Sequence, residues 1–310
     1  MQPQPKIVVV GSVNMDVVNN VVAFPQPGET VKASKTAFNG GGKGANQAVA
    51  AAAAGGAVEF VGAVGNDAFA EPLATGLSEH AVGIKALAHK QTTSGQAFIA
   101  IDAKGENTII LSAGANGQVT PDEIKAVHDL IAQADAVLTQ NEIPWEATLA
   151  AITLAHEEGV RVIVNPAPAA PLPAEVYSLI DTLTVNETEA ATLLGSRVES
   201  SDEVAAAAQA LIKRGARAVI LTVGARGSYY ADRDGQRIET PAFPVEVVDT
   251  TGAGDTFIGM YAVAASQMDV REALRFASAA SAIAVTRPGA QPSIPTRAEV
   301  EAFLARMAEK

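Results

Sequence analysis

The sequence of 310 residues contains no cysteine, which excludes disulfide bonds and thiolate chemistry. A chain without cysteine suits a reducing compartment, so the cytoplasm is the expected location. Positive charge is also scarce, because 22 Lys and Arg face 34 Asp and Glu and leave a net charge of −12. No general attraction to nucleic acid or to anionic lipid is expected from such a chain. Any phosphate site must therefore be built locally.

Long apolar runs are missing as well. The longest uncharged stretch, 44–58, is rich in alanine and is interrupted by Gly55 and Gly56. This composition favours a buried helix followed by a strand over a membrane span. The apolar run Ile7–Val10 is too short for the core of a secretion signal. We therefore expect neither a membrane anchor nor an export signal.

What the sequence does contain is an alternation of short β-branched runs with longer alanine-rich segments. Near-continuous apolar strands separated by helices are typical of a parallel sheet covered on both faces, so the predicted fold class is doubly wound α/β. The predicted strands are Ile7–Val10, Val58–Val64, Ala136–Thr139, Val160–Val164, Thr182–Val185 and Ala218–Val223. The predicted helices are Asp129–Ala134, Glu146–Glu158, Glu187–Leu194 and Asp202–Arg214. A chain of this length fits a single domain, residues 1–310.

Two segments interrupt this alternation. Residues 16–37 include Pro25 and Pro27, and residues 94–111 hold Lys104-Gly105-Glu106 between two alternating runs. Both segments are predicted to form antiparallel strands. Because such insertions do not easily join the middle of a parallel sheet, we expect a small β-layer at its edge that serves as a lid.

The most informative polar segment is 247–257, which leads into an alanine-rich helical pattern. Gly252 and Gly254 let the backbone approach a ligand, and successive N–H groups at a helix N-terminus suit a phosphate. Asp255 would lie in the first helical turn, where a base can accept a proton while the neighbouring amides, including Ala253, hold phosphoryl charge. From the residues alone, an ordinary glycine-rich turn is the alternative.

Two widespread phosphate-binding motifs are absent. Phe257 stands where the third glycine of a dinucleotide fingerprint would be, which argues against a Rossmann dehydrogenase. The segment Gly42-Lys43-Gly44 is not a P-loop, because neither Ser nor Thr follows the lysine. A kinase with this sequence must use another phosphate cradle.

Two polar segments in the first fifty residues are candidates for a ligand site. Residues 39–47 contain four glycines just before an alanine-rich helix, so the backbone, Lys43 and Asn46 could converge on a polar ligand. Asn14 and Asp16 follow the first predicted strand, at the edge where α/β proteins bind ligands, and they suit sugar hydroxyls. A flexible loop and an Asx-turn are the corresponding structural alternatives.

Two further strand ends carry polar residues. Residues 186–189, Asn-Glu-Thr-Glu, open a helix and could organise Mg²⁺ through water, although helix capping explains them equally well. Residues 222–227 end a strand with two glycines and could line a nucleotide pocket or form an ordinary hairpin turn. Neither segment is decisive alone.

Four motifs together resemble those of the ribokinase family, within the wider group of carbohydrate and purine kinases. They are Gly-Gly-Lys-Gly-Ala-Asn-Gln-Ala at 41–48, Asn-Glu-Thr-Glu at 186–189, Asp-Thr-Thr-Gly-Ala-Gly-Asp-Thr-Phe at 249–257 and Ala-Val-Thr-Arg-Pro-Gly-Ala-Gln-Pro-Ser at 284–293. The resemblance extends from about Ile7 to Leu304. It implies phosphorylation of D-ribose at the 5-hydroxyl by ATP with Mg²⁺, a β-lid over the sugar, and a homodimer formed through that lid.

The resemblance also implies roles for individual residues. The base would be Asp255, beside an anion hole formed by Gly252, Ala253 and Gly254. The implied sugar-binding residues are Asn14, Asp16, Gly42, Lys43, Asn46, Glu142 and Asp255. The implied ATP-binding residues are Asn186, Thr222, Gly224, Ala225, Arg226, Gly227, Gly254 and Ser278. The implied neighbours of an activating K⁺ are Asp249, Thr251, Ala284, Arg287, Gly289 and Ser293, and Glu189 would shape the Mg²⁺ site through water.

The sequence departs from the family pattern at two positions. Ser278 stands where the family often carries a histidine near the adenine, and Pro288 replaces a common basic residue. Two alternatives also stay open. A kinase of the same fold for deoxyribose, fructose or a nucleoside would differ in the side chains of residues 94–111. A non-catalytic sugar-binding protein would have no need of Asp255.

Overall fold

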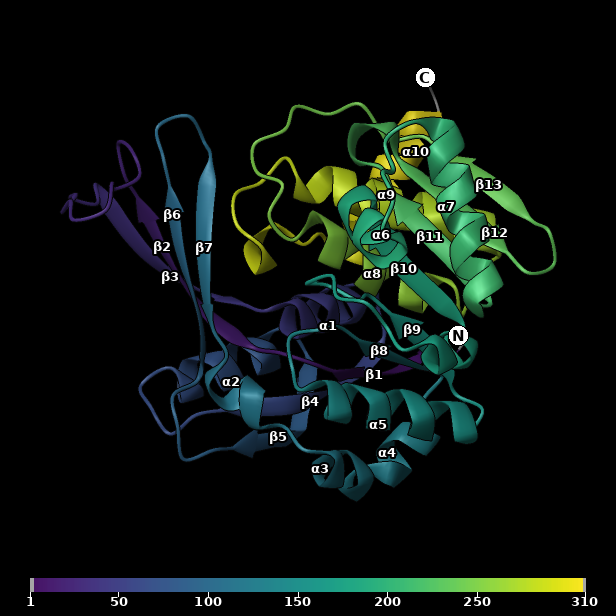
Figure 1. Ribbon diagram of the computed structural model, residues 1–310, viewed down its shortest axis with the longest axis horizontal. Helices are drawn as coiled ribbons and strands as arrows, with labels where there is room; N and C mark the ends of the chain where they lie inside the picture. The colour runs from purple at the N-terminus through teal and green to yellow at the C-terminus, as the bar shows by residue number, and fades with distance from the viewer. Residues whose placement is uncertain (1–2, 309–310) are drawn as a thin grey trace.

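The computed structural model describes residues 3–308, which form two sheets (Figure 1). Nine strands make a large sheet in the order β13-β12-β11-β10-β9-β8-β1-β4-β5, and four strands make a small sheet in the order β3-β2-β6-β7. Neighbouring strands of the large sheet run parallel from β11 to β5, whereas β12 and β13 form an antiparallel hairpin at one edge. The predicted doubly wound parallel sheet is confirmed, with an antiparallel edge as an addition.

The predicted strands and helices agree with the structure to within a few residues. The strands of the large sheet are β1 (Lys6–Val10), β4 (Ala57–Val64), β5 (Val82–His89), β8 (Ala136–Thr139), β9 (Arg161–Val164), β10 (Thr182–Asn186), β11 (Ala218–Thr222), β12 (Ser228–Asp232) and β13 (Arg237–Thr240). The helices are α1 (Lys43–Ala53), α2 (Ala70–Glu79), α3 (Pro121–Ala126), α4 (His128–Ala132), α5 (Trp145–Glu157), α6 (Glu187–Leu194), α7 (Ser201–Arg214), α8 (Ala253–Ala264), α9 (Val270–Ala284) and α10 (Arg297–Ala308).

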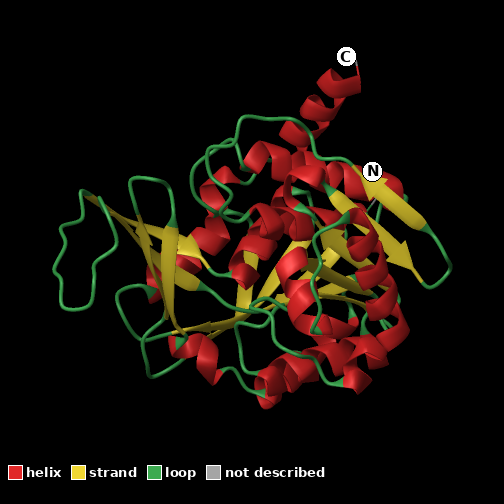
Figure 2. Ribbon diagram, turned by 45° about the horizontal axis from the view of Figure 1, so that its top comes forward, coloured by secondary structure: helices red, strands yellow, loops and turns green. Residues whose placement is uncertain are grey.

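Strand β1 shows why the central strands are apolar along their whole length. Ile7 and Val9 belong to a core formed with α1, α8 and α9, while Val8 and Val10 belong to a second core formed with α5, α6 and α7. Successive side chains of a strand point to opposite faces, so a sheet covered on both faces needs apolar residues at every position. Figure 2 shows helices on both sides of the strands.

The small sheet consists of β2 (Asn14–Asn20), β3 (Lys35–Gly41), β6 (Gly95–Ile101) and β7 (Asn107–Ser112), and it projects from one end of the large sheet (Figure 1). Strands β2 and β3 pair antiparallel, as do β6 and β7. These two pairings confirm the prediction.

Three features of the small sheet correct the prediction. The central strands β2 and β6 pair in parallel, because they come from two separate insertions rather than from one hairpin. The first pair of strands extends past the predicted limits of 16–37 at both ends, the second passes the limits of 94–111 only at Ser112, and residues 21–34 form no strand. Pro25 and Pro27, which cannot donate to a strand ladder, lie in that stretch. The glycine-rich segment is also not a loop, since residues 39–41 end β3 and only Gly42 separates β3 from α1.

Within residues 3–308, no helix is both long enough and apolar enough to cross a bilayer.

Candidate active site

The polar segments that follow the strands of the large sheet meet at one edge, because the carboxyl ends of parallel strands lie side by side. They line a cavity of about 220 Å³ between α1, α6 and α8. Its lining residues are Lys43, Asn165, Thr184, Val185, Asn186, Glu189, Thr222, Thr250, Gly252, Gly254, Asp255 and Ile258. The predicted base and several predicted nucleotide-site residues therefore share one cavity.

Asp255 lies in the first turn of α8 and is only 8% exposed. Its two carboxylate oxygens have different donors: Asn46 Nδ2 donates to Oδ2 at 3.0 Å, and Gln47 Nε2 donates to Oδ1 at 3.0 Å. The positive end of the helix dipole favours the charged form of a carboxylate at this position. Asp255 is thus a buried, oriented carboxylate with a free lone pair on each oxygen.

The turn before α8 supplies backbone donors next to Asp255. Gly252 has a φ of 72°, and a Cβ there would lie 3.1 Å from Ala290, so the turn requires glycine. The N–H of Ala253 donates to the carbonyl of Thr250 at 3.2 Å. The N–H groups of Gly254 and Asp255, at the start of the helix, have no acceptor recorded among the described residues. A bound anion would use these two directly and would have to replace the Thr250 carbonyl to reach Ala253.

Lys43 is surrounded by acidic groups. Its side chain is mostly buried, which by itself lowers the pKa of an amine, but the carboxylates of Asp255, Glu142 and Glu189 outweigh burial and raise the pKa of Lys43 above its ordinary value. The backbone N–H of Lys43 also donates to Glu142 Oε2 at 3.0 Å. Lys43 is therefore held as a cation in the middle of the site.

Asp16 is the strongest electrostatic anomaly of the site. Burial, followed by repulsion from Glu142 and Asp255, raises the pKa of Asp16 to about 7. Gly41, its neighbour on β3, has no room for a side chain, because a Cβ there would lie 2.1 Å from Asp16 Oδ2. Strand β3 thus brings its glycines against a carboxylate that has few partners within the protein.

Asn14 and Gly42 complete this side of the site. Asn14 is 5% exposed, and its Oδ1 accepts from Asn116 Nδ2 at 2.7 Å. Gly42 has a φ of 88°, and a Cβ there would lie 2.9 Å from the backbone nitrogen of Asn14. The structure brings the predicted sugar-binding residues together. Asn14 and Asp16 lie at the start of β2, and Gly42 to Asn46 lie at the start of α1. Glu142 and Asp255 face both of these segments.

The segment 186–189 both caps a helix and supplies a carboxylate to the cavity, which are the two alternatives that the sequence left open. Asn186 Oδ1 accepts from the N–H of Glu189 at 2.8 Å and Glu189 Oε2 accepts from the N–H of Asn186 at 2.9 Å, which is a capping box. Glu189 nevertheless lines the cavity, and burial raises the pKa of this carboxyl despite hydrogen bonds that oppose the shift. Capping therefore positions Glu189 without withdrawing it from the cavity.

The other predicted nucleotide residues are only partly brought to this cavity. Thr222 lines it, whereas the side chain of Arg226 forms an ion pair with Glu187 at the start of α6. Ser278 is buried in the middle of α9 and does not line the cavity.

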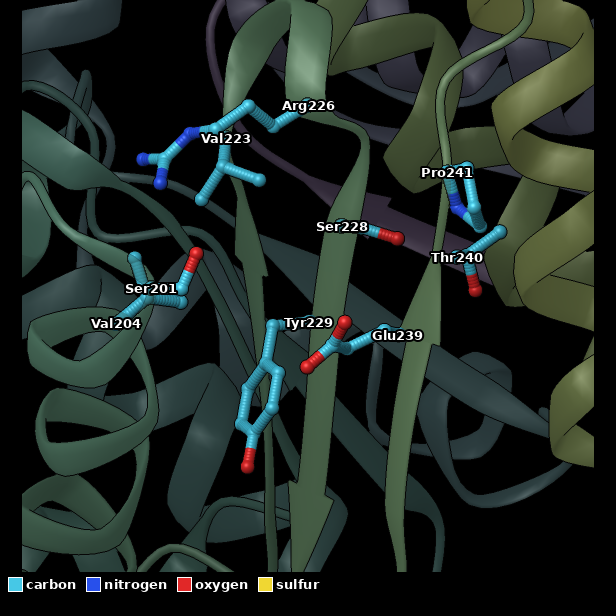
Figure 3. A pocket seen from close by; sticks show the side chains of 9 residues that line it. All are labelled: Ser201, Val204, Val223, Arg226, Ser228, Tyr229, Glu239, Thr240 and Pro241. Atoms are coloured by element: carbon cyan, nitrogen blue, oxygen red, sulfur yellow. The ribbon is translucent and has the colours of Figure 1, made fainter.

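A second hollow borders the turn at residues 222–227 (Figure 3). It is formed by residues from α7, β12 and β13 and contains none of the predicted sugar-binding residues. Its lining residues are Ser201, Val204, Val223, Arg226, Ser228, Tyr229, Glu239, Thr240 and Pro241. Residues of the turn therefore line both hollows, and of these two the one with Asp255 has the groups for phosphoryl chemistry.

The predicted cation neighbours gather beside the turn before α8. Asp249 Oδ1 accepts from the N–H and hydroxyl of Thr251 at 2.9 and 2.6 Å, and Asp249 Oδ2 accepts from the N–H of Gly289 at 2.8 Å. Burial opposes these bonds, but they prevail and lower the pKa of Asp249 below its ordinary value. Arg287 directs its guanidinium to Glu299 at 2.6 Å, so only its carbonyl is left for a cation. Ser293 donates to the carbonyl of Ala290 at 2.7 Å, and Ala284 ends α9 next to this loop.

This cluster offers oxygen atoms only, from one ionised carboxylate, hydroxyls and backbone carbonyls. Such a donor set fits a hard cation such as K⁺ and does not fit a thiolate- or imidazole-binding metal. Among residues 3–308, no group of three or more His, Asp or Glu side chains is arranged to hold a metal ion by itself.

Four buried amides were missed by sequence reasoning. Gln47 contacts Asp255, Gln140 and Asn165 extend the contacts of Gln47, and Asn116 holds Asn14. Gln140 and Asn165 each follow directly after a predicted strand, β8 and β9, so the rule that strand ends carry ligand-site residues would have found them. Gln47 belongs to the motif at 41–48 but had been given no role.

Comparisons with known proteins agree with this geometry. The profile of the pfkB family of carbohydrate kinases matches residues 4–297. The bifunctional ribokinase/ribose-5-phosphate isomerase A of Fructilactobacillus sanfranciscensis is 43% identical over 299 residues, which are 94% of this chain and 55% of that protein. The chain therefore spans about half the length of that relative. The ribokinase of Haemophilus influenzae is 39% identical over 300 residues, which are 96% of this chain and 98% of that protein.

A solved structure has the same fold. The structure of Arabidopsis thaliana ribokinase complexed with ribose and ATP matches with a TM-score of 0.91 at 34% identity, and the match covers 97% of this chain and 99% of that one.

Proposed function

This chain belongs to the pfkB family of carbohydrate kinases, and from that membership we propose that its site transfers the terminal phosphoryl group of ATP to the 5-hydroxyl of D-ribose. The observation that carries the proposal is the buried, doubly hydrogen-bonded carboxylate of Asp255 beside unpaired N–H groups at the start of α8. A base and an anion-binding helix start in one cavity are what phosphoryl transfer to an alcohol needs.

In the proposed reaction, Asp255 accepts the proton of the sugar hydroxyl as that oxygen forms its bond to the terminal phosphorus of ATP. The bond from this phosphorus to the bridging oxygen breaks, and ADP leaves with the electron pair. The N–H groups of Gly254 and Asp255, with those of Gly252 and Ala253, carry the negative charge that builds on the phosphoryl oxygens. The cation of Lys43 stabilises the same charge and the carboxylate of the base.

The sugar binds, in this proposal, between the start of β2 and the start of α1. Asp16 and Glu142 accept hydrogen bonds from sugar hydroxyls, while Asn14, Lys43 and Asn46 donate to them. Polar groups placed for a hydroxyl lose their partner when it is absent, so a ribose site of this kind disfavours a deoxy sugar. The small sheet closes over the sugar and excludes water from the reaction.

ATP is proposed to lie along the carboxyl ends of β10 and β11. Asn186 and Thr222 border the cavity there, and the turn 224–227 with Ser278 beyond it forms the farther part of the nucleotide site. Mg²⁺ is proposed to be held by the phosphates and, through water, by Glu189, whose buried carboxylate lies in the same cavity.

An activating K⁺ is proposed at the oxygen cluster of Asp249, Thr251, Ala284, Arg287, Gly289 and Ser293. When bound, such an ion supplies fixed positive charge beside the anion hole. The chain's own contribution is to fix the turn before α8, since Asp249 ties Thr251 to Gly289.

A homodimer and a cytoplasmic location complete the proposal. Exposed apolar side chains of the small sheet, such as Phe98, Ile109 and Ile110, support pairing through this sheet with a second copy. The cytoplasm is supported by the use of ATP as phosphoryl donor.

The test is ADP release from ATP and Mg²⁺ with ribose, 2-deoxyribose, fructose and adenosine as acceptors, with K⁺ or with tetramethylammonium in its place. We expect ribose to give the highest kcat/KM, and K⁺ to raise it. Faster turnover with another acceptor would be consistent with Asp255 as the base but would reject ribose as the substrate. No turnover with any acceptor would leave a sugar-binding protein as the better reading.

A further inference from the structure

The carboxylate of Asp255 rests on a row of buried amide side chains, of which Gln47 and Gln140 do not line the cavity. Gln140 Nε2 donates to Gln47 Oε1 at 2.7 Å, and Gln47 Nε2 donates to Asp255 Oδ1 at 3.0 Å. Gln47 is completely buried and Gln140 is 1% exposed. A buried amide that makes hydrogen bonds at both ends has no freedom to rotate.

The directions of these bonds agree with one another: Gln140 Nε2 donates to Gln47, while Gln140 Oε1 has no hydrogen-bond partner among the described residues. An amide side chain has one end that only accepts and one end that only donates. Because Gln140 donates to the oxygen of Gln47, the NH₂ group of Gln47 must face Asp255, where it stabilises the charged form of the carboxylate. Reversing Gln47 would set its oxygen against a carboxylate oxygen.

The row continues to the opposite wall of the cavity. Gln47 Nε2 also donates to Asn165 Oδ1 at 3.3 Å, and Asn165 Nδ2 donates to Glu189 Oε2 at 3.4 Å. Asn165 is anchored by a bond to the carbonyl of Thr184 at 3.0 Å. The predicted base and the carboxylate predicted to shape the Mg²⁺ site are thereby connected through two side chains.

Other charges also face Asp255. Lys43, at the start of α1, favours the charged form of Asp255, while the carboxylates of Asp16 on β2 and Glu189 on α6 oppose it. Glu142 faces Asp16 and Lys43. The Nε2 donor of Gln47 adds to the attraction between Lys43 and Asp255 and offsets the repulsion from the carboxylates of Asp16 and Glu189.

We propose that Gln47 is a positioning residue that keeps the carboxylate of Asp255 aimed at the acceptor hydroxyl, and that Gln140 acts through Gln47 by holding its amide in place. This assignment rests on the proposed function, because it presupposes that Asp255 is the base. Neither glutamine is a catalytic residue, since neither reaches the reacting atoms.

The first test is Gln47→Met, which keeps an unbranched side chain of similar length and removes the donor. The loss of one hydrogen bond to a charged group predicts a fall in kcat of about 10- to 100-fold. KM for ribose should stay close to wild type, because Asn14 and Asp16 are unchanged. The acid limb of the kcat/KM profile should move to higher pH by roughly one unit. Asp16 is present in wild type and in Gln47→Met, so the difference between their pH profiles reports the effect of Gln47.

The second test is Gln140→Met, alone and combined with Gln47→Met. Gln140 does not contact Asp255, yet its loss should reproduce the fall in kcat and the shift of the acid limb. Since Gln140 acts through Gln47, the double variant should be no slower than Gln47→Met within about threefold. Independent, multiplying effects of the two substitutions would overturn the coupling.

The matched control is Gln209→Met on α7, on the opposite face of the large sheet. Gln209 Nε2 is buried and has no hydrogen-bond partner among the described residues, so this substitution should leave kcat and the pH profile unchanged. Ribose affinity by calorimetry shows that each variant is folded. A Gln47→Met enzyme with wild-type kcat and pH profile, or one that loses ribose binding and turnover together, would overturn the inference.

The outcome is separable from that of the proposed function. Wild-type turnover with the acceptor panel decides the function before any variant is made. If another acceptor is preferred, the same variants are compared on that acceptor, and the ratio to wild type still decides the role of Gln47.

Discussion

Strands β8 and β7 differ completely in their exposure to solvent. All four residues of β8 are buried between the two cores, whereas all six residues of β7 are exposed. The end of β8 leads to Gln140 and the floor of the site, which we define as Asn46, Gln47, Gln140, Asn165 and Asp255. β7 belongs to the small sheet, where Ile110 is 66% exposed.

This difference in burial indicates separate roles for the floor and for the small sheet. The side chains of the floor hydrogen-bond to one another, and both carboxylate oxygens of Asp255 accept from neighbouring amides, which suits an oriented base. The small sheet is more exposed, which suits the proposed closure over the sugar and the proposed pairing with a second copy. Asn14 and Asp16 lie where the two regions meet, so changes there should affect both binding and stability.

The largest effect is expected from breaking the floor at its centre. Asp255→Ala should lower kcat about 10²- to 10⁴-fold, because a general base acts chiefly in the transition state. Single-turnover ADP formation measures the loss, and calorimetry should show ribose binding within a few-fold of wild type. Near-normal turnover would remove Asp255 from the mechanism.

A smaller effect is expected where the regions meet. Asp16→Asn should lower kcat/KM for ribose about 10- to 100-fold, mostly through KM, because a charged acceptor is lost. A ribose saturation curve measures the split between KM and kcat. An unchanged preference between ribose and 2-deoxyribose would contradict the assignment of Asp16 to the sugar.

The same variant should be more stable than wild type, in a pH-dependent way. The pKa of Asp16 is raised to about 7 in the folded protein, so folding costs free energy once this carboxyl must be charged, and wild type loses stability as pH rises from about 4 to 7. Asn cannot ionise. Thermal unfolding should therefore show Asp16→Asn more stable by up to about 4 kcal/mol at pH 8. The gain should vanish near pH 4, and a gain that does not change with pH would point to packing instead.

A change on the small sheet should leave the floor intact. Ile110→Glu places a charge on an exposed apolar surface, and in a symmetric dimer the charge would appear twice in the interface. Sedimentation should show a dimer for wild type and a monomer for the variant, with unfolding free energy changed by less than about 0.5 kcal/mol. A variant that stays dimeric would place the interface elsewhere.

The smallest effect is expected outside both regions. Ala81, between α2 and β5, has a φ of 59°, a left-handed conformation that suits glycine. Ala81→Gly should raise the free energy of unfolding by about 0.5 to 1 kcal/mol in urea titrations and leave kcat unchanged. This variant serves as the comparison for separating stability from catalysis in the others.

Much of the fold could be predicted from the sequence alone. The β-branched runs gave the central strands to within a residue or two, because a strand buried on both faces must be apolar at every position. The hairpin β12–β13 was not predicted. The parallel pairing of β2 with β6 was missed because it joins segments about eighty residues apart.

For the site, sequence determined which polar residues follow a strand, such as Asn14 and Glu189, and which lie at a helix start after a glycine-rich segment, such as Lys43 and Asp255. Only the tertiary structure decided how they act on one another. The raised pKa of Asp16 depends on burial near Glu142 and Asp255, which are remote in sequence. The amide of Gln47 meets Asp255 at one end and Gln140, 93 residues away, at the other. Local patterns determine strands, helices and turns, whereas electrostatic shifts and side-chain orientation arise from distances between segments that only the folded chain brings together.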